Sequence, residues 1–276
     1  MNLRRRAFLG AIAVAATLCL GASVGCDKPK PQDQAPREDK LVVFAAASLR
    51  EVFTTIGEDF ERAHPGVEIT FNFAGTQELR TQLEHGASAD VFASADQRHM
   101  DELVRASRAE SPAVFARNEP VVVVSKESMS TITGFAKLPE ATRIVIGTPE
   151  VPIGRYTLQI LDNASKKLGS DFRARVEANV VSRELNVRQV LSKISLGEAQ
   201  AGFVYRTDAQ TVKEGIGLLA IPAELNVVAE YPIAVVTGAE HPSLARSFVD
   251  YVRSAEGQHT LSAAGFSAPA DLAKAE

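Results

Sequence analysis

The sequence predicts an α/β fold with mainly parallel sheets, and three observations support that prediction. Short apolar runs of strand length alternate with stripes of helical spacing from residue 41 onward. Such alternation is typical of parallel sheets covered by helices. The chain has 276 residues, of which 45% are hydrophobic and 23% charged, a globular composition that excludes a fibrous or wholly disordered chain. This length is enough to bury a large core in one or two domains.

The first part of the body shows the alternation most clearly. Strands are expected at residues 41–44, 67–73 and 91–93. Helical stripes follow them, at Leu49, Val52, Phe53, Ile56 and Phe60, then at Leu79 and Leu83, and then after Asp96. Ser48 precedes the first stripe and Glu51 stands three residues later, which predicts an N-terminal capping box. Gly86 is expected to end the second helix.

The rest of the body continues the pattern. Strands are expected at residues 121–124, 144–146, 179–181, 202–205 and 233–236. Helices are expected from about Gly154, over the stripe Val187, Val190, Leu191 and Ile194, and late in the chain over Leu244, Phe248, Tyr251 and Val252. No internal repeat interrupts this order, so the sequence predicts successive strand–helix units.

The first 25 residues have the organisation of an export signal. Arg4, Arg5 and Arg6 precede an apolar run over residues 7–20, and small residues follow. The run is too short for a transmembrane helix. The arginines also resemble a twin-arginine signal, so two export routes stay open. Cys26 ends this segment in a sequence that resembles a bacterial lipobox, with Ser23 where an aliphatic residue is usual.

We expect Cys26 to be lipidated and to anchor the protein to the membrane; the alternative is plain cleavage near residues 22–25 and release. Residues 26–40 are polar and rich in proline and charge, which predicts a flexible tether. Removing residues 1–25 removes three arginines and no acidic residue, so the net charge changes from −4 to −7. An acidic chain without Trp does not predict nucleic-acid binding. The two cysteines lie at positions 19 and 26, which leaves the body without thiols.

Five positions stand where a predicted strand ends or a helix begins: Ser48, Thr76, Ile153, Val187 and Tyr205. Open α/β sheets bind ligands at the carboxyl ends of their strands. Helix N-termini present unpaired N–H groups there, and three hydroxyl groups add further donors. If these positions converge, they form a set of neutral hydrogen-bond donors that suits a small dehydrated anion.

Four of these positions also have a structural interpretation. Ser48 and Thr76 are candidate helix caps, Tyr205 is a candidate core tyrosine, and Val187 belongs to the apolar stripe of its helix. The neighbouring arginines are expected on the surface or the rim: Arg50, Arg155, Arg188 and Arg206. Asp96 is expected to cap a helix. The five histidines are scattered and do not predict a zinc site.

Seven segments carry a resemblance to a known family: residues 43–49, 73–79, 89–101, 151–156, 186–191, 202–209 and 230–236. They include VFAAASL, FAGTQEL and ADVFASADQRHMD. In this order, the chain resembles the periplasmic molybdate-binding proteins of bacterial molybdate ABC transporters, which are type II solute-binding proteins. The family often has Ser at the position of Thr76 and in some members Ala at the position of Ile153. The loop at GTPEVPIGRY is one residue shorter than in some relatives.

The resemblance implies two α/β lobes joined by a two-strand hinge, one lobe formed by residues 41–120 and 232–276 and the other by residues 121–231. It implies that the oxyanion lies between the lobes, with Ser48 and Thr76 on one side. On the other side are Ile153 and Val187, through backbone N–H groups, and Tyr205, through its hydroxyl. These five residues are also the metal site if molybdate is counted as a metal.

The resemblance therefore predicts an exported, monomeric protein that captures molybdate, and also tungstate, and delivers it to the membrane permease of an ABC transporter, with no resident cofactor. A second hypothesis is the same fold with another oxyanion such as sulfate. A third is an exported hydrolase with Ser48 as nucleophile and Tyr205 as acid. We expect no enzyme, because no histidine stands out as a base and no GxSxG motif occurs.

Overall fold

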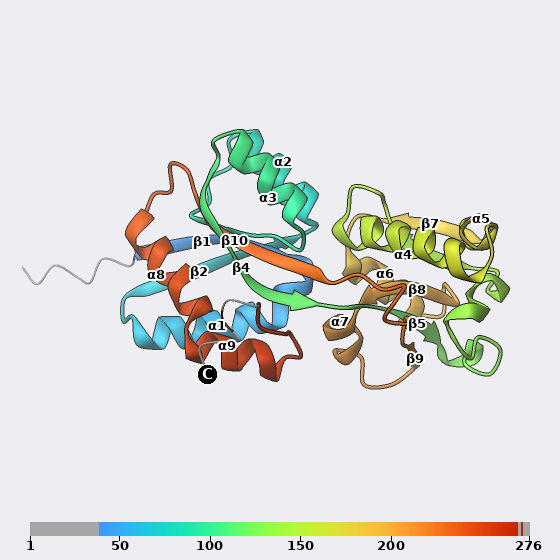
Figure 1. The fold of residues 1–276 in the computed structure, drawn as a ribbon. Coiled ribbons are helices and arrows are strands. Elements are labelled where there is room, and N and C mark those ends of the chain that lie inside the picture. The colour runs from blue at the N-terminus through green and yellow to red at the C-terminus, as the bar shows by residue number, and fades with distance from the viewer. Residues whose placement is uncertain (1–38, 270–271, 273–276) are drawn as a thin grey trace, which may run out of the picture. The chain divides into compact units, whose positions relative to one another are not determined.

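The computed structural model describes residues 39–269 and 272, and these residues form two five-stranded sheets (Figure 1). The first sheet has the order β2 (Val67–Ala74), β1 (Asp39–Ala46), β3 (Val91–Ala93), β10 (Ala229–Val236) and β4 (Ala109–Asn118). The second has the order β7 (Val180–Glu184), β6 (Ile144–Gly147), β8 (Ala201–Tyr205), β5 (Pro120–Ser125) and β9 (Ile216–Leu219).

Each sheet is mainly parallel, with one reversed strand. In the first sheet β1 pairs in parallel with β2 and β3, whereas β10 is antiparallel to β3 and β4. In the second sheet β6 pairs in parallel with β7 and β8, whereas β5 is antiparallel to β8 and β9. Four of the five strands in each sheet therefore point the same way, which confirms the predicted α/β class.

Helices cover both sheets, and each sheet with its helices forms one lobe. The first lobe contains η1 (Ala47–Leu49), α1 (Arg50–Ala63), α2 (Thr76–Glu84), α3 (Gln97–Arg105), α8 (Pro242–Arg253) and α9 (Ala255–Ala263). The second contains η2 (Lys126–Ser128), η3 (Phe135–Glu140), α4 (Pro152–Leu168), α5 (Phe172–Ala178), α6 (Val187–Ser195) and α7 (Arg206–Gln210). In Figure 1, α2 and α3 cover one face of the first sheet, and α1, α8 and α9 cover the other. No helix of the described residues is long and apolar enough to cross a membrane.

The predicted stripe on α1 forms the core of the first lobe. Phe53, Ile56 and Phe60 are completely buried. The Phe53 ring lies 5.5 Å from that of Phe115 on β4, and the Phe60 ring lies 5.3 Å from that of Phe248 on α8, measured between centroids. Aromatic pairs in this geometry stabilise a core beyond their apolar area. The stripe therefore fixes α1 on the sheet, and with it the turn that carries Ser48.

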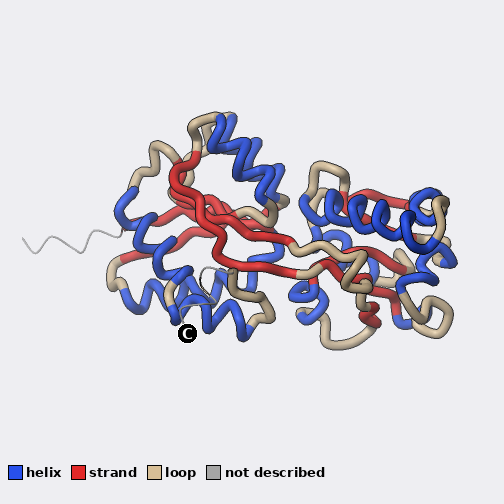
Figure 2. The backbone as a smooth tube through the Cα atoms, in the orientation of Figure 1, coloured by secondary structure: helices blue, strands red, loops and turns tan. Residues whose placement is uncertain are grey.

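The chain passes between the lobes twice (Figure 2). It leaves the first sheet at Asn118, the last residue of β4, and enters the second at Pro120, the first residue of β5. It returns through residues 220–228, between β9 and β10. β10 pairs with β4 from Ala229 onward, so the chain re-enters the first sheet three residues before the expected boundary at residue 232.

The predicted capping box at Ser48 is wrong. A 3-10 turn, η1, stands between β1 and α1, so Leu49 is the N-cap of α1 and no side chain caps it. The Ser48 hydroxyl instead lies 3.1 Å from the hydroxyl of Tyr231 on β10. The Ser48 hydroxyl therefore contacts β10 and does not cap α1.

The sequence did not predict β4, although it is the longest strand. Its burial is irregular, it contains Pro112, and Ser111 has a φ of 46°. Pro is tolerated on edge strands and at bulges, and β4 is an edge strand whose register with β10 shifts twice. At the N-terminal end, β1 begins at Asp39, so the last two residues of the predicted tether belong to the sheet. Residues 1–38, including Cys26, lie outside the described residues.

Candidate functional site

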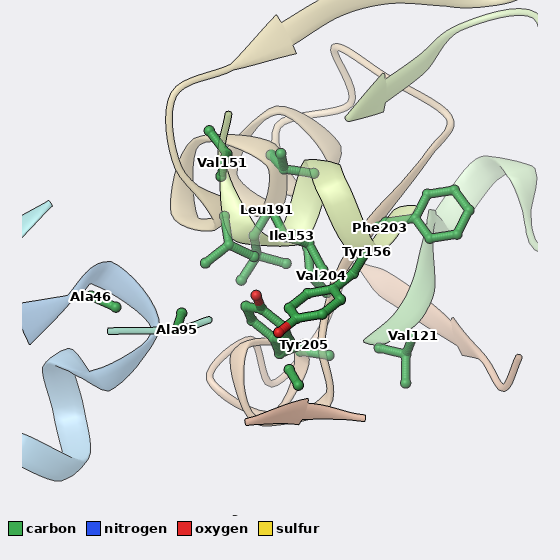
Figure 3. Close-up of a cluster of buried hydrophobic side chains, with 14 of the residues drawn as sticks. Ala46, Ala95, Val121, Val151, Ile153, Tyr156, Leu191, Phe203, Val204 and Tyr205 are labelled. Atoms are coloured by element: carbon green, nitrogen blue, oxygen red, sulfur yellow. The ribbon is translucent and has the colours of Figure 1, made fainter. Parts of the chain in front are cut away.

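A small cavity lies between the two lobes, and we call it the interlobe cavity. Its thirteen lining residues are Ala46, Ala47, Ser48, Ala74, Gly75, Thr76, Ala95, Val151, Pro152, Ile153, Asn186, Val187 and Tyr205. All five residues singled out in the sequence are among them. In Figure 3, Ala46 and Ala95 of the first lobe lie opposite Val151, Ile153 and Tyr205 of the second. The structure therefore brings together positions that are up to 157 residues apart in the chain, from Ser48 to Tyr205.

The size of the cavity limits the ligand. It leaves about 20 Å³ for the centre of a water-sized sphere. One water molecule needs roughly 10–15 Å³ by this measure. Pockets for drug-sized molecules have roughly 300–1,000 Å³. The interlobe cavity therefore suits a small inorganic ion and excludes most organic molecules.

The Tyr205 hydroxyl is the most informative group in the cavity. Tyr205 ends β8, and its side chain is 1% exposed. Its hydroxyl oxygen has no hydrogen-bond partner among the described residues. Leaving such a buried group unpaired costs about 1–3 kcal/mol. Burial raises the pKa of Tyr205 well above its ordinary value, so the group stays a neutral hydroxyl that can donate. An unpaired donor at a cavity wall indicates a ligand that accepts.

The other two hydroxyls are also buried, but each already has a protein partner. The Thr76 hydroxyl accepts a hydrogen bond of 3.2 Å from the backbone N–H of Ala95. Its own hydrogen thus remains available to the cavity. The Ser48 hydroxyl lies 3.1 Å from that of Tyr231, and either oxygen can be the donor in this pair.

Helix starts supply backbone donors to the same cavity. Ile153 is the second residue of α4, after Pro152, which has no N–H group. Val187 is the first residue of α6, and Asn186 caps that helix by accepting from the Gln189 backbone N–H. First-turn N–H groups have no partner within their helix. Together with the positive ends of the helix dipoles, they form a site that favours an anion.

No lining residue carries a charged side chain. An isolated ion in an apolar medium is very costly, so a buried anion needs hydrogen bonds to every exposed face. Neutral hydroxyl and N–H groups can supply them without adding a charge. Among the described residues, no group of three or more His, Cys, Asp or Glu side chains is placed to hold a metal cation. The chemistry of the cavity is therefore that of a neutral receptor for an oxyanion.

Charged residues lie around the rim instead, where they join the lobes. On one side, Arg155 of α4 pairs with Asp96 at 3.2 Å, and Asp96 also caps α3 as predicted. The His99 Nε2 lies 2.8 Å from the Glu150 carbonyl. Burial lowers the pKa of His99, so the ring is neutral and Nε2 donates this hydrogen bond.

On the other side of the rim, Arg188 of α6 pairs with Glu51 of α1 and with Asp208 of α7, the latter at 2.7 Å. Burial raises the pKa of Asp208 to about 7, against the opposing effect of the Arg188 charge. Arg155 and Arg188 are thus rim residues, as expected. They are mostly covered, however, because each bridges the two lobes.

The lobes also meet at Gln77 and Gly75 of the first lobe, which both lie against the Leu185 carbonyl of the second. The Gln77 side-chain amide donates to the Leu185 carbonyl at 2.6 Å, which connects α2 with the loop before α6. At Gly75, a Cβ atom would lie 2.3 Å from the same carbonyl. The lobes therefore approach each other so closely here that no side chain fits.

Sequence reasoning missed several residues of this site. Asn186 carries a recognisable signal, since Asn directly before a helical stripe is a common N-cap. Gly75 and Tyr231 gave no such signal, because their roles depend on contacts with Leu185 and Ser48, which only the folded chain brings close.

Comparison with known proteins identifies close relatives. The model of the family described as bacterial extracellular solute-binding protein matches residues 41–267. The chain is 39% identical to the molybdate-binding protein ModA of Mycobacterium tuberculosis over 95% of this chain and 96% of the relative. It is 30% identical to the putative ABC transporter substrate-binding lipoprotein YvgL of Bacillus subtilis, over 93% and 97%.

The fold has solved counterparts as well. The structure of the periplasmic molybdate-binding protein of Azotobacter vinelandii superposes with a TM-score of 0.72, covering 83% of this chain and 99% of the other. At 20% sequence identity, this likeness shows the two-lobed fold alone.

Proposed function

The chain belongs to the family of bacterial extracellular solute-binding proteins, and from that premise we propose that it captures molybdate between its lobes and delivers it to an ABC transporter. The unpaired, buried Tyr205 hydroxyl at the cavity wall is the observation that carries this proposal. The 39% identity to ModA of Mycobacterium tuberculosis over nearly the whole chain supports the choice of ligand. Tungstate has nearly the same size and charge, so the same cavity accepts it.

We propose five ligand contacts in this cavity. Ser48, Thr76 and Tyr205 donate through their hydroxyls, and Ile153 and Val187 donate through backbone N–H groups. Their common burial and the absence of charged lining residues support this assignment. Molybdate is fully deprotonated at neutral pH and accepts at all four oxygens, so it matches a set of donors. Hydrogen phosphate carries a proton that needs an acceptor, and sulfate is smaller than the space molybdate fills.

Delivery requires the lobes to open and close. The two connections at Asn118–Pro120 and residues 220–228 are the flexible points available for a hinge. The rim contacts of Asp96, Glu51 and Gln77 with the second lobe hold the closed state. In this account the protein acts by binding and release and performs no chemical reaction.

Calorimetric titration with four oxyanions tests the function. The chain from residue 37 onward, which retains β1, is titrated with molybdate, tungstate, sulfate and phosphate. We expect tight binding of molybdate and tungstate and no heat with sulfate or phosphate. Sulfate binding of equal strength would favour the alternative oxyanion. No heat with molybdate on folded protein would contradict the proposal.

We also propose that residues 1–25 direct export and that Cys26 carries a lipid anchor, with residues from 26 to the start of β1 as the tether of a monomeric protein. The lipoprotein relative in Bacillus subtilis supports this. Replacing Cys26 by Ser tests it. We expect the unsubstituted protein in the membrane fraction and the variant released outside the cytoplasm; equal distribution of both would contradict lipidation.

A further inference from the structure

A buried pair of hydroxyl groups connects Ser48 with β10, the strand by which the chain re-enters the first sheet. Tyr231 lies on β10 and is completely buried, and its hydroxyl is 3.1 Å from that of Ser48. Tyr231 is not one of the predicted ligand contacts.

The direction of this hydrogen bond follows from what each hydroxyl can reach. A hydroxyl group has one hydrogen to donate and accepts at its oxygen. Ser48 lines the interlobe cavity, so a ligand there can accept its hydrogen, whereas Tyr231 is completely buried and does not line the cavity. A fully deprotonated anion only accepts, so it requires the Ser48 hydrogen to point into the cavity.

The Tyr231 hydrogen then points toward Ser48. Burial raises the pKa of Tyr231 well above its ordinary value, so the group remains a phenol with a hydrogen to donate. The Ser48 oxygen is the acceptor that the described residues place beside it. With that oxygen accepting from Tyr231, the Ser48 hydrogen is directed away from Tyr231, toward the interlobe cavity that Ser48 lines.

We propose that Tyr231 is a positioning residue that makes the Ser48 hydroxyl a donor toward the bound oxyanion. The backbone N–H of Ala95 does the same for Thr76. Both hydroxyls then have their accepting side occupied by protein, so the cavity offers hydrogens and few lone pairs. This inference rests on the proposed function, since it explains why that site prefers a fully deprotonated oxyanion.

A double-mutant cycle on molybdate affinity tests the proposal. The variants are Tyr231→Phe, Ser48→Ala and the pair, measured by calorimetry. Losing one neutral orienting hydrogen bond is expected to weaken binding about two- to tenfold in Tyr231→Phe. In the Ser48→Ala background, Tyr231→Phe is expected to change the affinity by less than about 1.5-fold, because Tyr231 acts through Ser48. A purely structural role would give the same loss in both backgrounds.

Ser125→Ala is the matched control. Ser125 is buried and pairs with the Ser128 hydroxyl at 3.1 Å, within the second lobe and away from the cavity. It should lower thermal stability without changing molybdate affinity. If Tyr231→Phe does not fold, Tyr231→Met, which also removes the hydroxyl and fills the buried space, takes its place in the cycle with the same expectation. Unchanged affinity, or equal losses with and without Ser48, would overturn the inference. Failure of the unsubstituted protein to bind molybdate would contradict the proposed function itself.

Discussion

The three hydroxyls of the interlobe cavity differ in their hydrogen-bond partners within the protein. Thr76 and Ser48 each have a neighbouring donor or hydroxyl, whereas the Tyr205 hydroxyl has no partner among the described residues. A hydrogen bond to a ligand would therefore satisfy the Tyr205 hydroxyl, which is otherwise unpaired. Its ring is held between those of Tyr156 and Tyr231, at 6.5 and 5.7 Å between centroids, so the hydroxyl has a fixed position.

Tyr205→Phe should therefore weaken molybdate binding by about 1.5–3 kcal/mol, the range for a hydrogen bond to a charged group. The unliganded variant should be as stable as the unsubstituted protein or more stable, because an unpaired buried hydroxyl is removed. Calorimetry and thermal unfolding measure the two effects. Tyr251→Phe, at a half-buried position on α8, is the control and should leave the affinity unchanged. Unchanged affinity in Tyr205→Phe would remove this residue from the site.

Asp208 makes a pH-dependent contribution to stability. Burial raises the pKa of its carboxyl to about 7 in the folded protein. Between the ordinary pKa of an aspartate and this value, the native state holds a proton that the unfolded state has lost. Stability from this group is therefore present at low pH and is lost as the pH rises toward and through 7.

We expect the unfolding free energy of the protein to fall relative to that of Asp208→Asn by about 2–3 kcal/mol between roughly pH 5 and pH 8. Urea unfolding at the two pH values measures it for both chains. The Asn variant serves as the reference, since it keeps the side-chain volume and cannot titrate. A constant difference across this range would show that Arg188 keeps the Asp208 carboxyl ionised throughout.

At the scale of elements, three helix starts form a large part of the cavity wall. α2, α4 and α6 each begin at the cavity, and their first residues line it. Gly75, just before α2, has a φ of −60° that any residue can adopt. Its lack of a side chain leaves room for the Leu185 carbonyl of the other lobe and for the Gln77 amide that donates to this carbonyl.

Gly75→Ala should therefore oppose closure while leaving each lobe intact. We expect molybdate affinity to fall at least about tenfold, since closure must now displace a Cβ atom from the Leu185 carbonyl. The unliganded stability should change by no more than about 1 kcal/mol, the scale of an N-cap substitution.

Gly134→Ala is the matched control, because Gly134 is also an N-cap with ordinary φ and no atom lies within 4 Å of its added Cβ. Binding and thermal unfolding are measured for both. Normal molybdate affinity in Gly75→Ala would show that the lobes need not approach this closely.

The same elements show how far the sequence could be read. The stripes of α1 and α6 and the alternation in β2 predicted their elements, because local periodicity records which face is buried. The irregular burial of β4 hid a strand whose pairing with β10 decides its structure. Ser48 lines the interlobe cavity together with the other four predicted positions, but its predicted local partner was wrong, since its contact with Tyr231 spans 183 positions. The Gly75–Leu185 approach exists only between the lobes.

At the scale of the whole molecule, the cavity is lined by uncharged residues, and charged side chains lie around its rim. The ion pairs of Arg155 with Asp96 and of Arg188 with Glu51 connect the lobes without entering the cavity, and Asp208 of the second lobe also pairs with Arg188. Arg155 thus has one carboxyl partner and Arg188 has two, so these groups add no net positive charge around the cavity. In the proposed function, the oxyanion is therefore held by hydrogen bonds from both lobes, which couples capture to closure.

The most direct test is a crystal structure of the molybdate complex with data collected at the molybdenum absorption edge. The account predicts one anomalous peak inside the interlobe cavity, with oxygens within hydrogen-bond distance of the hydroxyls of Ser48, Thr76 and Tyr205. It also predicts the backbone N–H groups of Ile153 and Val187 at the remaining oxygens. A peak elsewhere in the protein, or molybdate held by charged side chains, would contradict it.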